Sequence, residues 1–586
     1  MKTPGAVVPP LAGRWAALIL AAAVALFGNQ PACAGEPTTP ATPNKTPDYA
    51  PAIERLQRVA ADVLAEGFVP GVSIALVDDQ KTISSRGFGW ANARRKTPAT
   101  GQTVYRAGSI SKLFTALAAA QLAEQGKLDL DGPVSQYDPN FRIVNPFADA
   151  VPVTLRQLMC HRSGMVRESP VGGYFDASGP TLAATVGSIV PCVLVHPPNT
   201  RTRYSNVGPS IVGHVVGQLS GVPFEAYQQA HLLRPMGMTS SGFVLSDAMR
   251  SRLAVARMDV ADGRGGFRTI EAPHFELGTL PAGNLYTTAG DLARFLSVLL
   301  AEGASQGKAI VKPATLREML TVQLSSEKAG FGLGFHVDRF RGHRSIGHTG
   351  AVYGFTSSVR FLPDVKLGVV VLSSADLALG PVRRLSETAL SLLLEAKLGT
   401  PLPQEKTAPM PAEPAACAGE YESEGYWARI EAEGGSLRGS ISGAAIRLVP
   451  TGPDEFLAHG PQLHREPVAF HREAGRVVAF STLGQRFRRV DAAAVPKPPG
   501  DWHKLLGSYG PDFIPLVVTL RHGHLYAMTE NMADYRLVPV NRAVFRFPVG
   551  LYEDEHLVFQ LGPDGRVHGV ILANMELARS PGAKSH

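Results

Sequence analysis

Ser109 and Lys112 are the residues whose types and spacing point most directly to chemistry. They lie three positions apart at the start of the largely apolar stretch 113–119, so a helix there would place both side chains on one face. A serine hydroxyl is a weak nucleophile until a neighbouring base accepts its proton. A lysine can be that base where burial and nearby cations lower its pKa. The pair therefore predicts nucleophilic catalysis, and the N–H groups of the helix start would favour a developing oxyanion.

Two further short motifs follow along the chain. A Tyr-Ser-Asn motif begins at Tyr204, 95 residues after Ser109, and a His-Thr-Gly motif begins at His348, 239 residues after it. Together with Ser-x-x-Lys they resemble the three signature elements of the serine β-lactamase and penicillin-binding-protein superfamily, which are Ser-x-x-Lys, Tyr-x-Asn and Lys/His-Thr-Gly. The order and the spacings are also those of that superfamily.

The sequence around the motifs agrees with this resemblance. Residues 157–165 resemble the superfamily's Leu-Leu-x-His-x-Ser-Gly-Leu segment, and residues 281–295 resemble its Pro-Ala-Gly-Gly-Leu-x-Ser-Thr-x-x-Asp-Leu-Ala-Arg-Phe stretch. Residues 331–335 and 362–364 fit as well. The resemblance covers residues 51–398 and is closest to the class C β-lactamase-like branch, which includes esterases, D-amino-acid-specific peptidases and carboxypeptidases.

The resemblance implies a catalytic role for three side chains. Ser109 would be the nucleophile that the substrate acylates, and Lys112 would accept or relay its proton. Tyr204 would act as general base and then as acid toward the leaving group. A tyrosine titrates near pH 10, so this use requires nearby cations, which Lys112 and the His348 position could supply. The sequence leaves open whether Lys112 or Tyr204 is the general base.

The other motif residues would bind the substrate. Asn206 would bond the substrate amide or hold the motif lysine, and the oxyanion hole would combine the backbone N–H of the nucleophile with that of Ala351, after Thr349 and Gly350. His348 replaces the lysine common in true β-lactamases. Because a histidine is mostly neutral near pH 7, this position favours esters, or peptides with an accessible amine or amide, over β-lactams as substrates.

Local patterns predict the elements that must position these residues. Residues 71–77 and 368–373 read as buried strands. Thr288 reads as the cap of a helix, with Asp291 three residues on completing a capping box. Strands near both ends with helices between them predict an α+β domain over residues 51–398. The resemblance implies an antiparallel sheet flanked by helices, plus an all-helical subdomain.

Proline-rich stretches divide the rest of the chain. Residues 35–50 and 399–414 are predicted linkers, and residues 415–492 and 500–586 form two similar blocks. Each block contains Arg-Leu-Val-Pro, and five matches between the blocks recur at offsets of 88 to 90 residues. Alternating segments between glycine-containing turns predict an antiparallel β-barrel for each block.

The two predicted barrels extend the resemblance. A penicillin-recognising domain followed by two barrels resembles the D-stereospecific aminopeptidases, which also carry a histidine in the third motif. In that group a loop of the last barrel reaches into the active site, and here residues 526–534 are the candidate loop. The alternative is that the barrels are spacers or bind the cell wall or a partner.

Residues 1–34 read as a secretory signal. A positive flank precedes 13 apolar residues, and Ala-Cys-Ala at residues 32–34 is a cleavage pattern. The apolar stretch is too short to span a bilayer. The residues before Cys33 fit a lipid-attachment box poorly, so we expect a periplasmic or secreted protein without a lipid anchor. An exported compartment permits a disulfide between Cys160 and Cys192, and two separate buried thiols are the alternative.

Composition excludes several classes of function. The formal charge of +7 is mild and no run of five like charges occurs, so we expect no nucleic-acid partner. The histidines near His348 lack flanking ligands at metal spacing, and no phosphate-binding glycine loop appears, which predicts neither metal nor cofactor. We expect an exported serine hydrolase that cleaves an ester, amide or peptide. The alternatives are a D-amino-acid-specific aminopeptidase, a β-lactamase, or a non-catalytic binding or sensor protein of the same fold.

Overall fold

An eight-stranded antiparallel sheet organises the first part of the chain. The computed structural model describes residues 47–147, 151–261, 266–404 and 406–580. The strand order is β10-β11-β12-β13-β14-β1-β2-β3. The bounds are β1 Gly71–Asp78, β2 Lys81–Asn92, β3 Thr97–Pro98, β10 Gly330–Phe331, β11 His336–Phe340, β12 His343–Val352, β13 Phe355–Leu362 and β14 Leu367–Ser373. The two strands expected from the sequence are β1 and β14. They pair with each other, so the sheet joins the two ends of this domain's sequence.

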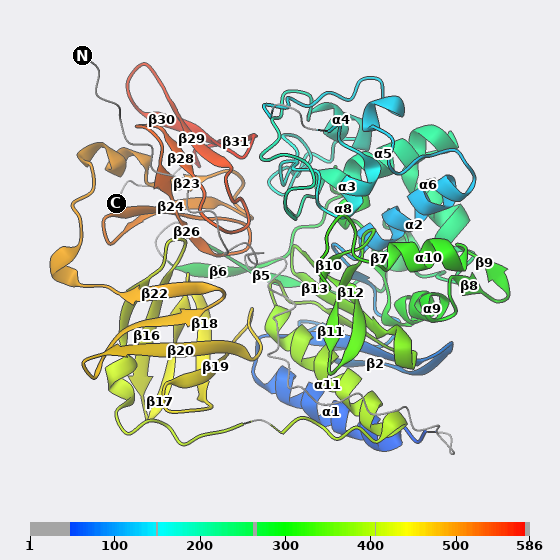
Figure 1. Ribbon diagram of the computed structural model, residues 1–586, viewed down its shortest axis with the longest axis horizontal. Coiled ribbons are helices and arrows are strands. Elements are labelled where there is room, and N and C mark those ends of the chain that lie inside the picture. Colours follow the sequence, from blue (N-terminus) through cyan, green and yellow to red (C-terminus); the bar gives the residue numbers. More distant parts are fainter. Residues whose placement is uncertain (1–46, 148–150, 262–265, 405, 581–586) are drawn as a thin grey trace, which may run out of the picture.

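Helices cover both faces of this sheet. Helices α1 (Ala50–Ala65) and α11 (Leu379–Leu398) pack on one face and share an apolar core with β1 and β14 (Figure 1). Helix α9 (Ala289–Leu300) packs on the other face. Its predicted cap is present, because the Thr288 hydroxyl accepts a bond from Asp291 N at 3.1 Å. The Asp291 carboxylate does not bond the Thr288 backbone N–H, as a capping box requires. It accepts hydrogen bonds from Ser240 N and the Ser241 hydroxyl instead.

The helical part of this α+β domain lies between β3 and β10 in sequence. Its buried centre is α2, which packs against α5 and α8. The helices are α2 Ser111–Glu124, α3 Leu155–Met159, α4 Leu182–Gly187, α5 Val207–Ser220, α6 Phe224–Gln228, α7 Asp247–Arg250, α8 Leu280–Gly283 and α10 Pro313–Met319. The short strands here are β4 Tyr105–Arg106, β5 Arg257–Ala261, β6 Phe267–Glu271, β7 Tyr286–Thr287, β8 Ala304–Ser305 and β9 Lys308–Ala309.

A closed eight-stranded antiparallel barrel follows. Its strands are β15 Gly419–Glu422, β16 Trp427–Glu433, β17 Ser436–Ile441, β18 Ala444–Pro450, β19 Glu455–His459, β20 Glu466–Glu473, β21 Arg476–Thr482 and β22 Gln485–Arg489. Strand β15 pairs with β22 at Tyr421 and Arg489, which closes the barrel. Its 460–463 turn contacts α11, where Gly380 N donates to Pro461 O at 2.9 Å.

The last domain is the second antiparallel β-barrel that the repeat predicts, and its strands fall into two sheets. One sheet is β23 Gly507–Tyr509, β24 Leu516–Arg521, β25 His524–Met528 and β26 Asp534–Arg536; the other is β27 Val538–Pro539, β28 Val544–Arg546, β29 His556–Leu561, β30 Val567–Leu572 and β31 Met575–Ala578. A bridge between Tyr509 and Arg579 joins them at one edge, at the position equivalent to Tyr421 and Arg489. On the other side only Leu537 separates β26 from β27, and its N–H donates to Leu525 O on β25 at 2.9 Å, so one continuous segment joins the two sheets there.

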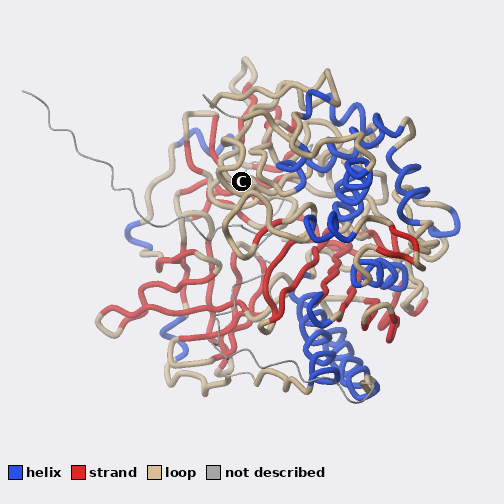
Figure 2. The backbone as a smooth tube through the Cα atoms, turned by 45° about the vertical axis from the view of Figure 1, so that its right-hand side comes forward, coloured by secondary structure: helices blue, strands red, loops and turns tan. Residues whose placement is uncertain are grey.

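The α+β domain lies beside the two β domains, which are on the left of Figure 1, and it contains both the large sheet and most of the helices (Figures 1 and 2). The fold class expected from the sequence, an α+β domain followed by two antiparallel β-barrel domains, is confirmed. The predicted signal at residues 1–34 and residues 35–46 of the predicted linker lie outside the described residues. The three described cysteines, Cys160, Cys192 and Cys417, are buried free thiols, so Cys160 and Cys192 form no disulfide.

Candidate active site

Ser109 is the point where the three predicted catalytic side chains meet. Its Oγ accepts a hydrogen bond from Lys112 Nζ at 2.9 Å and another from the Tyr204 hydroxyl at 2.7 Å. Ser109 lies just before α2, and Lys112 is in the first turn of that helix. Tyr204 comes from the loop that leads into α5. The tertiary structure therefore brings together side chains that are 95 positions apart in the sequence.

A glycine turn sets the position of the nucleophile. Gly108 adopts a left-handed φ of +54°, and a Cβ there would lie 2.8 Å from Ala351 N on β12. The next turn is fixed by Ser111, whose hydroxyl donates to Gly108 O at 2.6 Å and accepts from Leu285 N at 2.9 Å. Glycine at this position therefore allows β12 to approach the start of α2 closely.

Lys112 is buried and has three polar neighbours. Besides Ser109, its Nζ donates to Asn206 Oδ1 at 2.8 Å and to Ala282 O at 2.7 Å. Burial holds the pKa of Lys112 well below its ordinary value, against the opposing charge of Glu168. A neutral amine has two hydrogens, which the two oxygens of Asn206 and Ala282 can both accept. When the amine has lost its third proton, the 2.9 Å bond to Ser109 reverses, and the serine hydroxyl donates to the Lys112 lone pair.

Tyr204 is packed among rings and cations. The His161 ring is 4.3 Å from the Tyr204 ring centre, Lys112 Nζ is 4.9 Å away and the Arg167 guanidinium carbon is 5.6 Å away. Burial raises the pKa of Tyr204 above its ordinary value, although the bond to Ser109 and the charge of Arg167 lower it. The phenol is therefore protonated at neutral pH, and Arg167 is a nearby cation that sequence reasoning did not find.

Asn206 connects the catalytic lysine to a buried acid. While its Oδ1 accepts from Lys112, its Nδ2 donates to Glu168 Oε1 at 2.5 Å. Glu168 is fully buried, and burial raises its pKa to about 7 against the lowering effect of Arg167. The sequence left open whether Asn206 bonds the substrate amide or holds Lys112, and the structure shows the bond to Lys112.

The third motif lies on β12, next to the nucleophile. A Cβ on Gly350 would lie 2.0 Å from Ala107 O and 3.0 Å from Ser109 N, so only glycine permits this contact between the two segments. Thr349 and Ala351 flank Gly350 on the same strand. Tyr174 holds the strand from outside by donating to Ala351 O at 2.8 Å. The backbone N–H groups expected to form the oxyanion hole are therefore on adjacent segments.

His348 is buried and uncharged. Burial, followed by the positive charge of Lys112, lowers the pKa of His348 to about 3. Its Nδ1 contacts Thr349 O. The cationic influence on Tyr204 that the sequence placed at this position therefore comes from Arg167 and not from His348.

Comparison with known proteins agrees with this geometry. The model of the family described as Beta-lactamase matches residues 56–393, which is more than half of the chain. The chain belongs to the β-lactamase family. It is 28% identical over 345 residues to the human putative beta-lactamase-like 1, covering 56% of this chain and 66% of that protein. It is 23% identical over 323 residues to protein flp of Staphylococcus aureus, covering 55% of this chain and 63% of that protein. The chain thus spans just under two thirds of each relative's length.

Solved structures share the fold. The octameric penicillin-binding protein homologue from Pyrococcus abyssi has a TM-score of 0.52 and 24% identity, with 74% of this chain and 99% of that chain covered. The D-amino acid amidase from Ochrobactrum anthropi SV3 has a TM-score of 0.50 and 22% identity, with 59% and 99% covered. These likenesses concern the fold alone.

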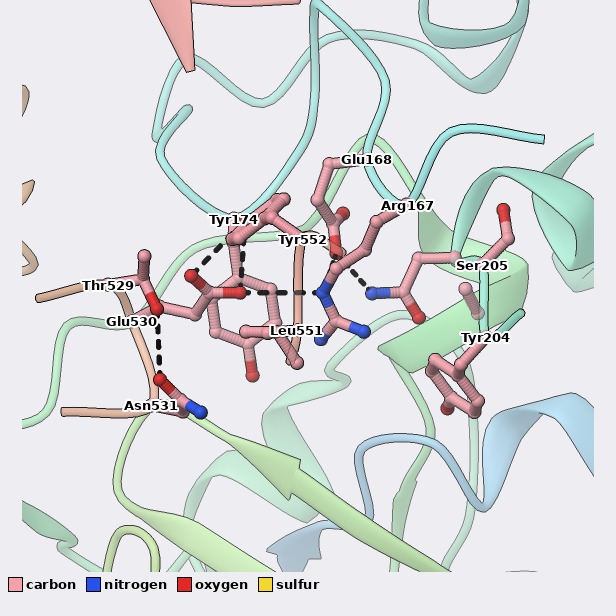
Figure 3. Close-up of polar contacts among 12 residues, drawn as sticks. Arg167, Glu168, Tyr174, Tyr204, Ser205, Thr529, Glu530, Asn531, Leu551 and Tyr552 are labelled. Atoms are coloured by element: carbon pink, nitrogen blue, oxygen red, sulfur yellow. Dashed lines mark hydrogen bonds and ion pairs between the residues drawn. The ribbon is translucent and has the colours of Figure 1, made fainter. Parts of the chain in front are cut away.

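Sequence reasoning missed a buried charged cluster beside this β-lactamase-family site (Figure 3). Arg167 Nε lies 3.5 Å from Glu168 Oε1 and 3.5 Å from Glu530 Oε1, and Tyr552 donates to the Glu530 carboxylate at 3.1 Å. The sequence pattern that could have indicated Arg167 and Glu168 is their position as a charged pair two residues after the segment 157–165. Glu530 comes from the loop 529–533 between β25 and β26, inside the segment 526–534 named from the sequence, and this loop lies against the cluster.

Arg162, within the segment 157–165, stabilises the loop that precedes Tyr204. Its guanidinium donates to Thr202 Oγ1 at 3.3 Å and to Asn199 O. Among residues 47–580 as far as they are described, no group of three His, Cys, Asp or Glu side chains is placed to hold a metal ion. In the same part of the chain, no helix is long and apolar enough to cross a membrane.

Proposed function

We propose that this chain is a serine hydrolase that cleaves a neutral ester or amide through an acyl-enzyme on Ser109. The observation that carries the proposal is that Ser109 Oγ lies within hydrogen-bond distance of both Lys112 Nζ, at 2.9 Å, and the Tyr204 hydroxyl, at 2.7 Å. A nucleophile between a buried amine and a protonated phenol has both a proton acceptor and a proton donor within reach.

The contacts support a definite order of proton transfers. Ser109 Oγ attacks the substrate carbonyl carbon while its proton moves to Lys112 Nζ. The N–H groups of Ser109 and Ala351 stabilise the oxyanion. When the intermediate collapses, Tyr204 gives its proton to the leaving oxygen or nitrogen, and the Lys112 ammonium stabilises the phenolate. Water then attacks the acyl group with the roles reversed, which releases the acid and regenerates Ser109.

His348 favours an uncharged substrate. A lysine in this motif is a permanent cation that can pair with a substrate carboxylate, whereas His348 is buried and neutral because of its lowered pKa. We therefore propose neutral esters and amides as the substrate class, ahead of β-lactams, whose carboxylate would lack this partner.

The test is labelling of the full chain with a fluorescent fluorophosphonate. Wild type and a Ser297→Ala control, changed at a serine of α9 away from the site, should be labelled at the same rate, and Ser109→Ala should not be labelled. Turnover is then compared on p-nitrophenyl esters, D-alanine p-nitroanilide and a chromogenic cephalosporin. Absence of both labelling and turnover in wild type would reject the hydrolase in favour of a binding or sensor protein.

We also propose that the protein is exported to the periplasm or secreted. The support is the sequence of residues 1–34, a positive flank followed by an apolar stretch and a small-residue cleavage pattern. Expression of the full chain, cell fractionation and sequencing of the mature N-terminus test it. A mature protein that keeps residues 1–34 in the cytoplasmic fraction would reject this proposal.

A further inference from the structure

An acidic turn of the last domain, residues 553–555, forms ion pairs and hydrogen bonds with the loop that carries Tyr204. Arg203, the residue before Tyr204, donates through its guanidinium to the Glu555 carboxylate and to Glu553 O. Arg201 donates to Glu553 Oε1 at 3.1 Å and to Asp554 Oδ2 at 2.5 Å. All these acceptors lie between β28 and β29 of the last domain, about 350 residues further along the chain.

Glu555 also reaches a second catalytic segment. Its Oε1 accepts from Arg167 N at 3.2 Å, so one carboxylate joins Arg167 to Arg203. The two segments also bond each other directly, because Asn206 N donates to Arg167 O at 2.8 Å. The Arg203 and Glu555 side chains are only 7% and 3% exposed. Water therefore cannot easily replace either partner.

The same domain contacts the catalytic segments at two further points. Glu530 pairs with Arg167, whose guanidinium faces the Tyr204 ring, and Figure 3 shows Arg167 between the Glu530 carboxylate and Tyr204. The Phe513 ring packs on Tyr353, which directly follows β12, with 5.8 Å between ring centres. These contacts orient the last domain against the active site, so Glu555 approaches Arg203 from a fixed direction.

We propose that Glu555 is a positioning residue that holds the Tyr204 hydroxyl against Ser109, so that the active site is complete only with the last domain docked. The inference rests on the proposed hydrolase function. Tyr204 is bonded to Ser109 through one hydroxyl, and its loop is tied down immediately before it by the Arg203–Glu555 pair. A displacement of about 1 Å at a catalytic group can cost roughly 100-fold in rate.

The test measures the second-order rate constant of fluorophosphonate labelling of Ser109 in the full chain. Glu555→Gln keeps the shape and one acceptor oxygen but removes the charge that pairs with Arg203. We expect labelling to slow roughly 10- to 100-fold. The matched control is Asp454→Asn, which likewise removes a carboxylate paired with an arginine, here Arg472 of the first barrel at 3.0 Å. It should label at the wild-type rate.

A double-mutant cycle with Tyr204→Phe separates positioning from general destabilisation. If Glu555 acts through the Tyr204 hydroxyl, Glu555→Gln should slow labelling in the wild-type background and have little further effect in the Tyr204→Phe background. An equal slowing in both backgrounds, or wild-type labelling by Glu555→Gln, would overturn the inference.

A variant that does not fold and a wild type that is not labelled have separate consequences. Should Glu555→Gln fail to fold, the same cycle is run with Arg203→Lys, which keeps the buried charge pair but loses the forked contact to Glu553 and Glu555. If wild type itself is not labelled, the hydrolase proposal fails and the inference with it. A labelled wild type with an unaffected cycle rejects the positioning role alone.

Discussion

Asn206 Oδ1 accepts a 2.8 Å hydrogen bond from Lys112 Nζ across 94 positions of sequence. With the Ala282 carbonyl as the second acceptor, this bond fixes both hydrogens of a neutral lysine and aims its lone pair at Ser109. Because both acceptors lack a proton to donate, the arrangement makes Lys112 the natural acceptor for the serine proton.

The first prediction concerns the pH dependence of Ser109 reactivity. Because burial lowers the pKa of Lys112 well below its ordinary value, its amine loses its proton at a lower pH than a free lysine. The rate constant of fluorophosphonate labelling should therefore rise with pH and level off well below pH 10.5. Lys112→Met should lose roughly 100- to 10,000-fold, and Lys308→Met, at an exposed lysine of β9, should match wild type. A Lys112→Met variant with an unchanged profile would contradict this assignment.

The second prediction concerns the oxyanion hole. Gly350→Ala should slow labelling and turnover roughly 100-fold, because its Cβ would collide with Ala107 O and displace β12 from Ser109 N. Gly187→Ala is the matched control, since a Cβ there meets nothing within 4 Å. Steady-state turnover of a p-nitrophenyl ester distinguishes the two variants. Full activity of Gly350→Ala would argue against an oxyanion hole formed by the N–H groups of Ser109 and Ala351.

The third prediction concerns substrate charge. His348→Lys places a cation where a neutral ring stands, so it should raise kcat/KM for a cephalosporin carboxylate relative to a neutral ester by about tenfold. His343→Lys, on the same strand but five positions away, should leave that ratio unchanged. The ratio for each variant is measured with the same two chromogenic substrates. If the ratio of the two kcat/KM values is unaltered in His348→Lys, this position does not recognise the charge of the substrate.

The fourth prediction concerns pH and stability. Burial raises the pKa of Glu168 to about 7 from an ordinary value of 4.5. The folded protein therefore holds a proton that the unfolded chain releases between about pH 4.5 and 7, so Glu168 makes stability fall as pH rises through that window. Glu168→Gln removes this titration. Relative to wild type it should gain about 1–3 kcal/mol in unfolding free energy between pH 4.5 and 7.5.

Denaturant unfolding at the two pH values measures this gain. Glu455→Gln, at an exposed carboxylate of β19, is the control and should follow wild type at both pH values. If Glu168→Gln also follows wild type, the buried carboxylate does not take up the proton. In that case Glu530, which shares Arg167 with Glu168, is the next carboxylate to substitute.

Local sequence patterns predicted much of the α+β domain. Strands β1 and β14 are continuous apolar runs, and α9 combines a threonine cap with a 3.6-residue apolar period, so short-range periodicity was sufficient to find them. The internal repeat likewise predicted both β-barrels. What the pattern did not predict is the division of the last barrel into two sheets, which meet at Leu537 and at the Tyr509–Arg579 bridge, because this depends on pairing between strands rather than on composition.

By itself, the sequence determined the residue types at the centre of the site, because Ser109 and Lys112 are one helical turn apart and their geometry is local. Only the tertiary structure decided their environment. The pKa directions of Lys112 and His348 follow from burial, which no short segment sets. Likewise, Glu555 reaches Arg167 across 388 positions, a contact that depends on how the last domain packs against the α+β domain.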